Sequence, residues 1–352
     1  MPAKDFTPTP EEWTKLYTLS FFSGAVGDMV GTQACLQNAI DDVLPGEIQK
    51  LDSNWALSWG PRVYKRDPQD VLFGPDNVWY AAANESEKLI LVAVAGTAAK
   101  SEQGWLVIDG DVRQTVDFKN WIATWTLDDI PKPNPSLAAP GTVRAAMGTC
   151  IGVWNVASSS SDSSSPGTTI GQYLETKQDY TVIFAGHSMG GAVAPLTALA
   201  LLQSKIVSSN KPWYILPSAG ATPGNQKLID LMTAQFPPGN LPSDPAKQYE
   251  VFNRDLYNTL DVVPQAWSLD GSSDRRLDNI KQIYAGLRDP AAGDLGIVVD
   301  GLEVLSRASG IEYEPIVGAH FSGVSFDASS LDPSNLDSVE KQGASWRSRL
   351  NA

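Results

Sequence analysis

The sequence predicts an α/β fold in which helices flank both faces of a mostly parallel central sheet. Three observations support this prediction. Strand-like and helix-like segments alternate along the chain, the run Leu89–Ala95 is apolar throughout, and Ser188 stands between glycines where a strand pattern changes to a helix pattern. An apolar run of this kind is typical of a strand buried on both faces, as in a parallel sheet.

The N-terminal part is expected to begin with a helix and to continue into a hairpin. Thr9 and Glu12 form a capping-box pattern with Pro10 at the first helical position. A turn at Asn84–Ser86 between two apolar runs indicates a hairpin. The further elements expected here are a helix over Thr32–Val43 that ends before Pro45, strands over Val78–Ala83 and Leu89–Ala95, and a helix over Thr142–Val156.

Strand and helix patterns continue to alternate in the second half of the chain. The segment Ser158–Ser165 has low complexity and predicts a flexible surface loop inserted within a domain, not a domain boundary. The expected elements are strands over Tyr180–Ala185, Trp213–Pro217, Gln248–Asn253 and Tyr313–Val317, a helix over Met189–Lys205, and a partly helical stretch over Asp270–Pro290.

The composition excludes several classes of function. Of the 352 residues, 42% are hydrophobic and 19% are charged, which is typical of a globular chain. The net charge of −14 repels polyanions and no basic stripe is present, so nucleic-acid binding is not expected. No apolar run is long enough to span a bilayer, so no stable membrane insertion is expected either.

The start of the chain and its two cysteines give further expectations. The residues after Met1 do not form a signal peptide, so the chain as written would be cytoplasmic, whereas removal of a native leader would make the protein secreted. Cys35 and Cys150 fit no zinc-binding spacing, and two unpaired core cysteines are favoured over a disulfide between them.

Ser188 is the candidate nucleophile. It lies between Gly186 and Gly190 in the stretch GHSMG, after a predicted strand and before a predicted helix. A sharp turn at such a place raises the serine hydroxyl above the edge of the sheet, and small neighbours leave room for it. A structural Gly-Ser turn is the alternative, but the strand-to-helix context favours the nucleophile.

A serine nucleophile needs a general base, and the chain contains only two histidines. His187 is adjacent to Ser188 and is expected to point away from its hydroxyl, as a packing residue beneath the turn. His320, in a loop after the last predicted strand, is therefore the candidate base by elimination. Where a strand–serine–helix turn carries the nucleophile, the acid lies between the serine and the histidine in the chain.

Asp261 is the candidate acid because it follows a predicted strand and precedes a break at Pro264. Its role would be to hold the histidine in one tautomer and to stabilise the imidazolium. Asp255 is the near competitor, but its neighbour Arg254 favours an ordinary solvated ion pair. Three other aspartates lie in polar sequence that favours an exposed surface, namely Asp270, Asp274 and Asp278.

Two backbone N–H groups are expected to form an oxyanion hole. The N–H of Met189 follows the serine at the start of a helix, where free N–H groups point toward the site. The second N–H is expected from Thr97, because Gly96 and Thr97 end the buried strand and glycine permits close approach. A plain strand-terminal turn is the alternative for these two residues.

These motifs resemble those of the class 3 lipase family, the fungal-type triacylglycerol lipases and their feruloyl esterase relatives. LILVAVAGT is similar to the strand that ends in the family's oxyanion turn, and GHSMGGA is similar to its nucleophile turn. GATPGN and NTLDVVP are similar to two motifs that follow, the second of which holds the acid, and a single late histidine completes the set. The resemblance covers residues 78–321.

The resemblance implies an α/β-hydrolase fold, hydrolysis of carboxylic esters, and a triad of Ser188, Asp261 and His320. No metal or organic cofactor is expected for this chemistry. The family has arginine at the position of Ala95, so whatever that arginine anchors is missing or replaced here.

The resemblance also implies a lid. Residues 1–352 are expected to form a single α/β-hydrolase domain with a lid or cap insertion. Residues 98–135 are the candidate lid, and residues 270–310 are a candidate additional cap. The segment Thr97–Pro140 is longer than the compact lid of the fungal enzymes.

A triacylglycerol or another long-chain ester is the first expected substrate, with an oil–water interface as a candidate place of action. Trp105, Trp121 and Trp125 are candidate substrate contacts in an apolar cover, and packing in the core is an equally open interpretation. A feruloyl or other short-acyl or aromatic carboxylesterase is the alternative. A serine peptidase and a catalytically silent binding protein are further alternatives, although a complete set of catalytic residues disfavours the silent protein. The oligomeric state is left open.

Overall fold

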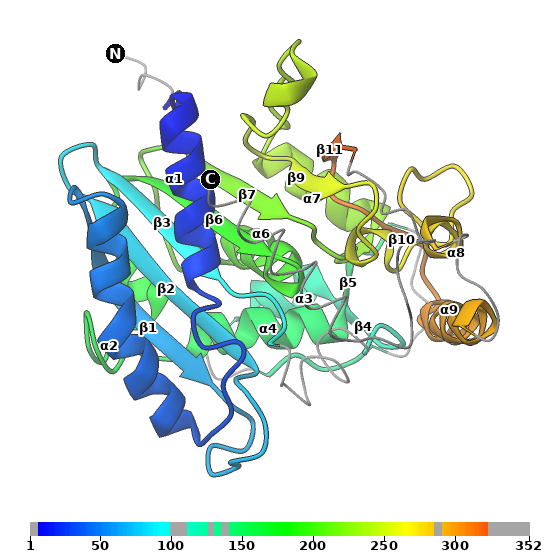
Figure 1. Cartoon of the computed structure of the whole chain (residues 1–352), viewed down its shortest axis with the longest axis horizontal. Coiled ribbons are helices and arrows are strands. Elements are labelled where there is room, and N and C mark those ends of the chain that lie inside the picture. Colours follow the sequence, from blue (N-terminus) through cyan, green and yellow to red (C-terminus); the bar gives the residue numbers. More distant parts are fainter. Residues whose placement is uncertain (1–5, 99–110, 126–129, 135–140, 285–290, 323–352) are drawn as a thin grey trace.

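The computed structural model describes residues 6–98, 111–125, 130–134, 141–284 and 291–322. A seven-stranded sheet crosses the molecule in the order β1-β2-β3-β6-β7-β9-β11 (Figure 1). Its strands are β1 (Trp55–Tyr64), β2 (Asn77–Asn84), β3 (Leu89–Val94), β6 (Thr181–His187), β7 (Trp213–Ser218), β9 (Asp255–Asn258) and β11 (Gly318–Phe321).

The sheet is mostly parallel, as the sequence predicts. Strands β3, β6, β7, β9 and β11 run in one direction. Strands β2 and β3 form the expected antiparallel hairpin, and β1 pairs antiparallel with β2. Because the parallel strands point the same way, the loops after their carboxyl ends gather at one edge of the sheet, where α/β folds place their ligands.

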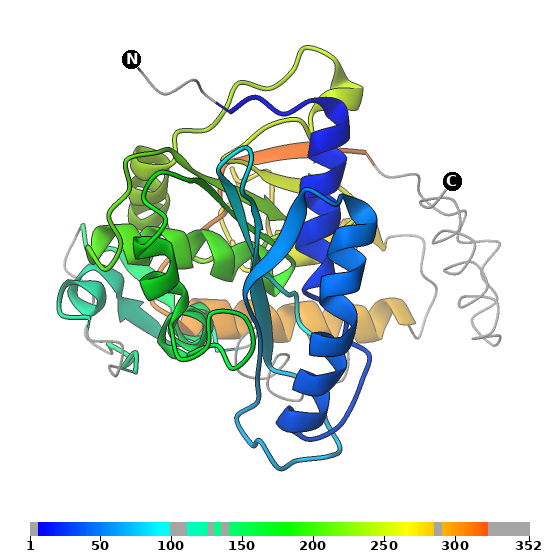
Figure 2. The same ribbon diagram turned by 90° about the vertical axis from the view of Figure 1, so that its left-hand side faces the viewer.

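Helices cover both faces of this sheet (Figure 2). On one face, α1 (Pro10–Phe22) and α2 (Gln33–Leu51) pack against a buried cluster that includes Leu16, Ile40 and Leu91. On the other face, a second cluster is built mainly by α4 and α6. The helices that contribute to this second cluster are α3 (Phe118–Ala123), α4 (Met147–Ser158), α5 (Ile170–Glu175), α6 (Met189–Gln203) and α7 (Gln226–Gln235).

A second, four-stranded sheet has the order β10-β8-β5-β4. A third buried cluster, which includes Trp267 and Tyr313, packs beside it. The elements of this region are β4 (Thr115–Asp117), β5 (Arg144–Ala146), β8 (Gly224–Asn225), β10 (Tyr313–Glu314), α8 (Asp278–Ile283) and α9 (Ala291–Ala308). The described residues also form the short 3-10 helices η2 (Pro245–Lys247) and η3 (Val263–Gln265). Helices α8 and α9 fall in the candidate additional cap, which stays a prediction.

The predicted start of the first helix is confirmed, whereas the predicted end of the second helix is wrong. Thr9 and Glu12 exchange both hydrogen bonds of a capping box, with Pro10 at the first helical position. Helix α2 does not stop before Pro45 but continues to Leu51. Leu44 and Ile48, on either side of the proline, are buried, and their packing offsets the one backbone hydrogen bond that the proline lacks.

The serine-rich segment is not a free surface loop, which corrects the sequence-based prediction. Ser161 is buried, and the backbones of Ser164 and Gly60 exchange two hydrogen bonds of 3.1 Å. The Ser163 hydroxyl donates to the carboxylate of Asp41 at 2.6 Å, and the Ser165 hydroxyl donates to a backbone carbonyl of β1. The hydroxyl groups thus fix the segment to α2 and β1.

Two strand predictions and one helix prediction also need correction. Residues 248–253 form no strand, because β9 begins only at Asp255. Within the range Thr142–Val156, where a helix is expected, residues 144–146 form β5 and the helix begins only at Met147. The expected last strand is β10, and it is followed by a further strand, β11.

Both cysteines are free, but only Cys150 is a core residue, because Cys35 is exposed. No helix among the described residues is both long enough and apolar enough to cross a bilayer.

Candidate active site

Ser188 occupies a strained turn between β6 and α6. Its φ of +56° and ψ of −124° lie in a region that side chains with a Cβ rarely adopt. The Ser188 N–H donates to the carbonyl of Ser218 at 2.9 Å, and the Gly191 N–H donates to the Ser188 carbonyl at 2.8 Å. Strain held by such bonds in a strand-to-helix turn is the geometry of a nucleophile elbow.

The glycines beside Ser188 have no room for a side chain. A Cβ on Gly186 would lie 2.2 Å from the carbonyl oxygen of Gly190. A Cβ on Gly190 would lie 2.1 Å from the carbonyl oxygen of Val94, at the end of β3. The start of α6 therefore approaches the end of β3 as closely as the backbones allow.

This approach brings the predicted oxyanion turn against the serine. A Cβ on Gly96 would lie 3.1 Å from the Cβ of Ser188 and 2.9 Å from the His187 carbonyl oxygen. Met189, the first residue of α6, is buried. The structure thus brings together Ser188, Met189 and the Gly96–Thr97 turn.

Two buried asparagines, which sequence reasoning did not find, lie behind Met189. The Asn155 side-chain amide donates to Oδ1 of Asn77 at 2.7 Å, and Nδ2 of Asn77 donates to the Met189 sulfur at 3.9 Å. Both side chains are only 1% exposed. Nothing in their local sequence marks them, because the contact joins α4, β2 and α6.

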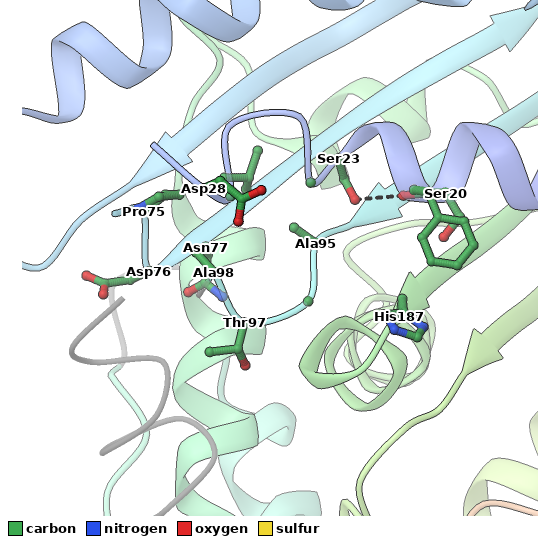
Figure 3. A pocket seen from close by; sticks show the side chains of 15 residues that line it. Ser20, Ser23, Asp28, Pro75, Asp76, Asn77, Ala95, Thr97, Ala98 and His187 are labelled. Atoms are coloured by element: carbon green, nitrogen blue, oxygen red, sulfur yellow. Dashed lines mark hydrogen bonds between the residues drawn. The ribbon is translucent and has the colours of Figure 1, made fainter. Parts of the chain in front are cut away.

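A cavity of about 250 Å³ lies beside the Gly96–Thr97 turn. Ala95, Thr97 and His187 form part of its wall, and Ser20 at the end of α1 lines it too (Figure 3). Phe21 also belongs to the wall. Both the Gly96–Thr97 turn and the end of α1 thus line this cavity.

His187 packs beneath the turn. Its Nδ1 lies 3.1 Å from the Ser218 hydroxyl, and its ring contacts the ring of Phe21 with centroids 5.1 Å apart. Burial lowers the pKa of His187, and the carboxylate of Asp261 acts in the opposite direction. These contacts fit the packing role expected for His187.

Asp261 lies three residues beyond the end of β9. Its side chain accepts a hydrogen bond from the Val263 N–H at 3.0 Å, and the residue is partly buried. Its charge influences both His187 and Asp255. The candidate acid therefore lies at the same sheet edge as Ser188.

His320 lies within β11, not in a loop as the sequence indicates. Its backbone pairs with that of Tyr257 in β9, and the two rings have centroids 5.8 Å apart. The His320 side chain is exposed. Within the described part of the chain, no hydrogen bond joins it to Ser188 or Asp261, and catalytic hydrogen bonds often form only once substrate is bound.

Asp255 does not form a solvated ion pair with Arg254, which corrects the prediction. Its carboxylate pairs with Arg275 at 2.6 Å, and the two side chains are 1% and 2% exposed. Arg254 instead donates to the carbonyls of Gly239 and Gly318. Burial raises the pKa of Asp255 to about 6, against the opposing charge of Arg275.

The tryptophans lie in the core where the structure describes them. Trp121 and Trp125 are buried, with ring centroids 5.3 Å apart, and both belong to the cluster beneath α6. Their burial favours core packing over an exposed cover. Trp105 lies outside the described residues, as do residues 99–110 and 126–129 of the candidate lid.

The described residues contain no group of three histidine, cysteine or acidic side chains placed to hold a metal ion.

Comparison with known proteins identifies the central part of the chain. Residues 113–269 match the family model described as Lipase (class 3). This segment belongs to the class 3 lipase family. The class 3 lipase segment contains Ser188, Met189 and Asp261, whereas Thr97 and His320 lie outside it. The match indicates a carboxylic ester hydrolase.

One solved structure shows that the fold extends beyond the class 3 lipase segment. The crystal structure of M37 lipase is 20% identical, with a TM-score of 0.61, over 90% of this chain and 84% of that chain. It confirms the α/β-hydrolase fold. A nonglycosylated LIP2 lipase from Yarrowia lipolytica is 16% identical over 74% of this chain and 76% of that chain, with a TM-score of 0.47.

A mono- and diacylglycerol lipase from Aspergillus oryzae is 18% identical over 74% of each chain, with a TM-score of 0.39. No curated protein matches the sequence.

Proposed function

We propose that this ester hydrolase is a triacylglycerol lipase that transfers the acyl group to Ser188. The observation that supports this most is the strained backbone of Ser188 with the Gly96–Thr97 turn packed against its Cβ. A tetrahedral intermediate formed at Ser188 would place its oxyanion beside that turn and the start of α6.

In the proposed first step, neutral His320 takes the proton of Ser188 as the hydroxyl attacks the ester carbonyl. Asp261 orients His320 and stabilises its charged form. The N–H groups of Thr97 and Met189 stabilise the oxyanion. His320 then protonates the leaving alcohol.

In the second step, His320 activates water, which attacks the acyl-serine and releases the acid. His320 must move toward Ser188 from its position beside Tyr257 for either step. Substrate binding at the sheet edge would bring the two side chains into hydrogen-bond distance.

The triad is tested with a serine-directed fluorophosphonate probe and with Ser188→Ala. The probe should label wild type at Ser188, and Ser188→Ala should lower kcat on the order of 10⁶-fold while the fold is retained. Ser165→Ala is a matched control, because Ser165 also has a positive φ, of 55°, but belongs to the serine-rich segment. Near-native turnover by Ser188→Ala would refute the assignment.

The substrate class is tested with an ester panel. Triacylglycerol emulsions of increasing acyl length are compared with soluble short-chain and feruloyl esters. A lipase should show a rise in rate once the glyceride exceeds its solubility. A preference for feruloyl or soluble short esters, with no such rise, would show an esterase instead.

A further inference from the structure

Four exposed apolar side chains gather on two neighbouring loops. Met29 and Val30 follow α1, and Val71 and Leu72 lie between β1 and β2. Their exposed fractions are 40%, 44%, 58% and 73%. We call these four residues the apolar tip, and both loops project at the lower end of the molecule in Figures 1 and 2.

Hydrogen bonds hold the two loops together. The Gly31 N–H donates to the Phe73 carbonyl at 3.3 Å, and the Gln33 N–H donates to the Pro68 carbonyl at 2.9 Å. The tip is therefore one surface made from two chain segments.

A buried lysine fixes the tip from inside. Lys65 is 3% exposed, and its ammonium group donates to the carbonyls of Gly31, Asp70 and Phe73 at 2.8–2.9 Å. It also pairs with the Asp70 carboxylate at 3.1 Å. An ammonium satisfied by four acceptors holds the loop backbones in place, so the apolar side chains are held outward and do not fold into the core.

The tip adjoins the candidate active site. Gly27 and Asp28, which precede Met29, line the same cavity as Gly96 and Thr97. Residues 75–77, which follow the other loop, line it too. Figure 3 labels Asp28, Pro75 and Thr97 among the residues that line this cavity. A surface that covered the tip would therefore face the edge of the sheet that carries Ser188.

We propose that the apolar tip docks the protein on a neutral or zwitterionic lipid surface, next to its active site. Apolar side chains clustered outside the core mark interaction surfaces, and this cluster lies where a lipid substrate must approach. The exposed carboxylates of Asp28 and Asp67 beside it, and the net charge of −14, disfavour an anionic lipid surface. The choice of a lipid surface as the partner of the apolar tip rests on the proposed lipase function.

The test uses the full chain with Val71→Ser and Leu72→Ser combined. Sedimentation with phosphatidylcholine vesicles measures binding, and hydrolysis of a soluble short-chain ester measures the active site. Loss of two apolar contacts should weaken vesicle binding about tenfold or more, whereas the soluble-ester kcat/KM should stay unchanged. Vesicles that contain phosphatidylglycerol should bind wild type more weakly than pure phosphatidylcholine does.

Two control variants make the result specific. Val43→Ser removes an apolar side chain of 49% exposure from α2, and Ile297→Ser with Val304→Ser removes two from α9. Both controls should bind vesicles like wild type. Undiminished binding by the tip variant, or a loss confined to the α9 variant, would overturn the proposal.

Vesicle binding can be measured in a variant that has no catalytic serine. Vesicle binding by Ser188→Ala should equal that of wild type, so failure of the proposed function leaves the docking result interpretable. A tip that pairs with a second copy would instead appear as a dimer in light scattering that the tip variant abolishes, and this outcome would also overturn the proposal.

Discussion

At the residue level, the tightest constraint lies in the glycines around Ser188. A serine can adopt the strained turn only because the carbonyls of β3 and the backbone of α6 meet without side chains between them. The absence of side chains at Gly186 and Gly190 thus determines the position of Ser188.

Gly190→Ala tests that constraint. The added Cβ would meet the Val94 carbonyl oxygen at 2.1 Å, so β3 and α6 must separate. Overpacking of this kind should lower the free energy of unfolding by about 3 kcal/mol. Displacement of the turn should lower kcat/KM about 100-fold. Urea unfolding and soluble-ester kinetics measure the two effects.

Gly301→Ala is the matched control. Gly301 is also a helical glycine, but its added Cβ would meet nothing within 4 Å. The substitution should raise the free energy of unfolding by about 0.5–1 kcal/mol through helix propensity. Equal effects of the two variants would contradict the close approach of β3 and α6.

At the element level, the buried pair of Asp255 and Arg275 joins β9 to the strand that carries His320. Arg275 donates to the Asp255 carboxylate and to the carbonyl of Ile316, shortly before β11. Its guanidinium carbon lies 4.5 Å from the centre of the Tyr257 ring, which in turn contacts His320. The position of the candidate base thus depends on this pair.

Arg275→Leu should destabilise the fold by about 3–5 kcal/mol at pH 7.5, because it leaves a buried carboxylate uncompensated. Burial already raises the pKa of Asp255 to about 6. Removal of the positive charge can only raise this pKa further, so below pH 6 the Asp255 carboxyl is protonated. The loss of unfolding free energy caused by Arg275→Leu should therefore become smaller as the pH falls. Urea unfolding at pH 5 and pH 7.5 measures both values.

Arg276→Leu provides the comparison, because Arg276 is partly exposed and bonds only nearby carbonyls of its own loop. It should change the free energy of unfolding by less than about 1 kcal/mol at either pH. A pH-independent loss in Arg275→Leu would show that Asp255 is not the group left uncompensated.

Elements with strong local patterns could be predicted from the sequence, and elements held by distant partners could not. The apolar run of β3 and the capping box of α1 carry their own information, and both are confirmed. The partner of Asp255 lies 20 residues away in the chain, so local sequence suggested Arg254 instead. Strand β11 has only one buried residue, Ala319, and gives no periodic signal.

The candidate site shows the same division. Local motifs mark Ser188, the Gly96–Thr97 turn and Asp261 as candidates, and the structure brings the first two into contact. The cavity beside them depends on the end of α1, which no motif connects with the site. Likewise, Asn77 and Asn155 support Met189 only through tertiary contacts.

At the level of the whole molecule, negative charge dominates. The chain carries 40 acidic and 26 basic residues, and its isoelectric point is near 4.6. Mutual repulsion between copies should therefore keep the protein dispersed at neutral pH and fade as the pH approaches that value.

Light scattering across pH 4–8 checks this expectation. Association should increase toward pH 4.6 and should be suppressed at pH 8. At pH 8, added salt should increase association by screening the repulsion. Association that is strongest at pH 8 would show that charge does not control it.

The hydrogen bond from the Tyr17 hydroxyl to the Tyr249 carbonyl has a consequence for synthesis on the ribosome. The bond spans 232 residues, and the ring of Trp13 in the same helix contacts the Phe252 ring in a tilted arrangement, with centroids 4.4 Å apart. At a synthesis rate of about 5–20 residues per second, the first helix must wait for about 10–50 seconds before these partners emerge. During that interval the part of the helix that packs on Tyr249 and Phe252 is unprotected, so the nascent chain should be a better chaperone client than the finished protein.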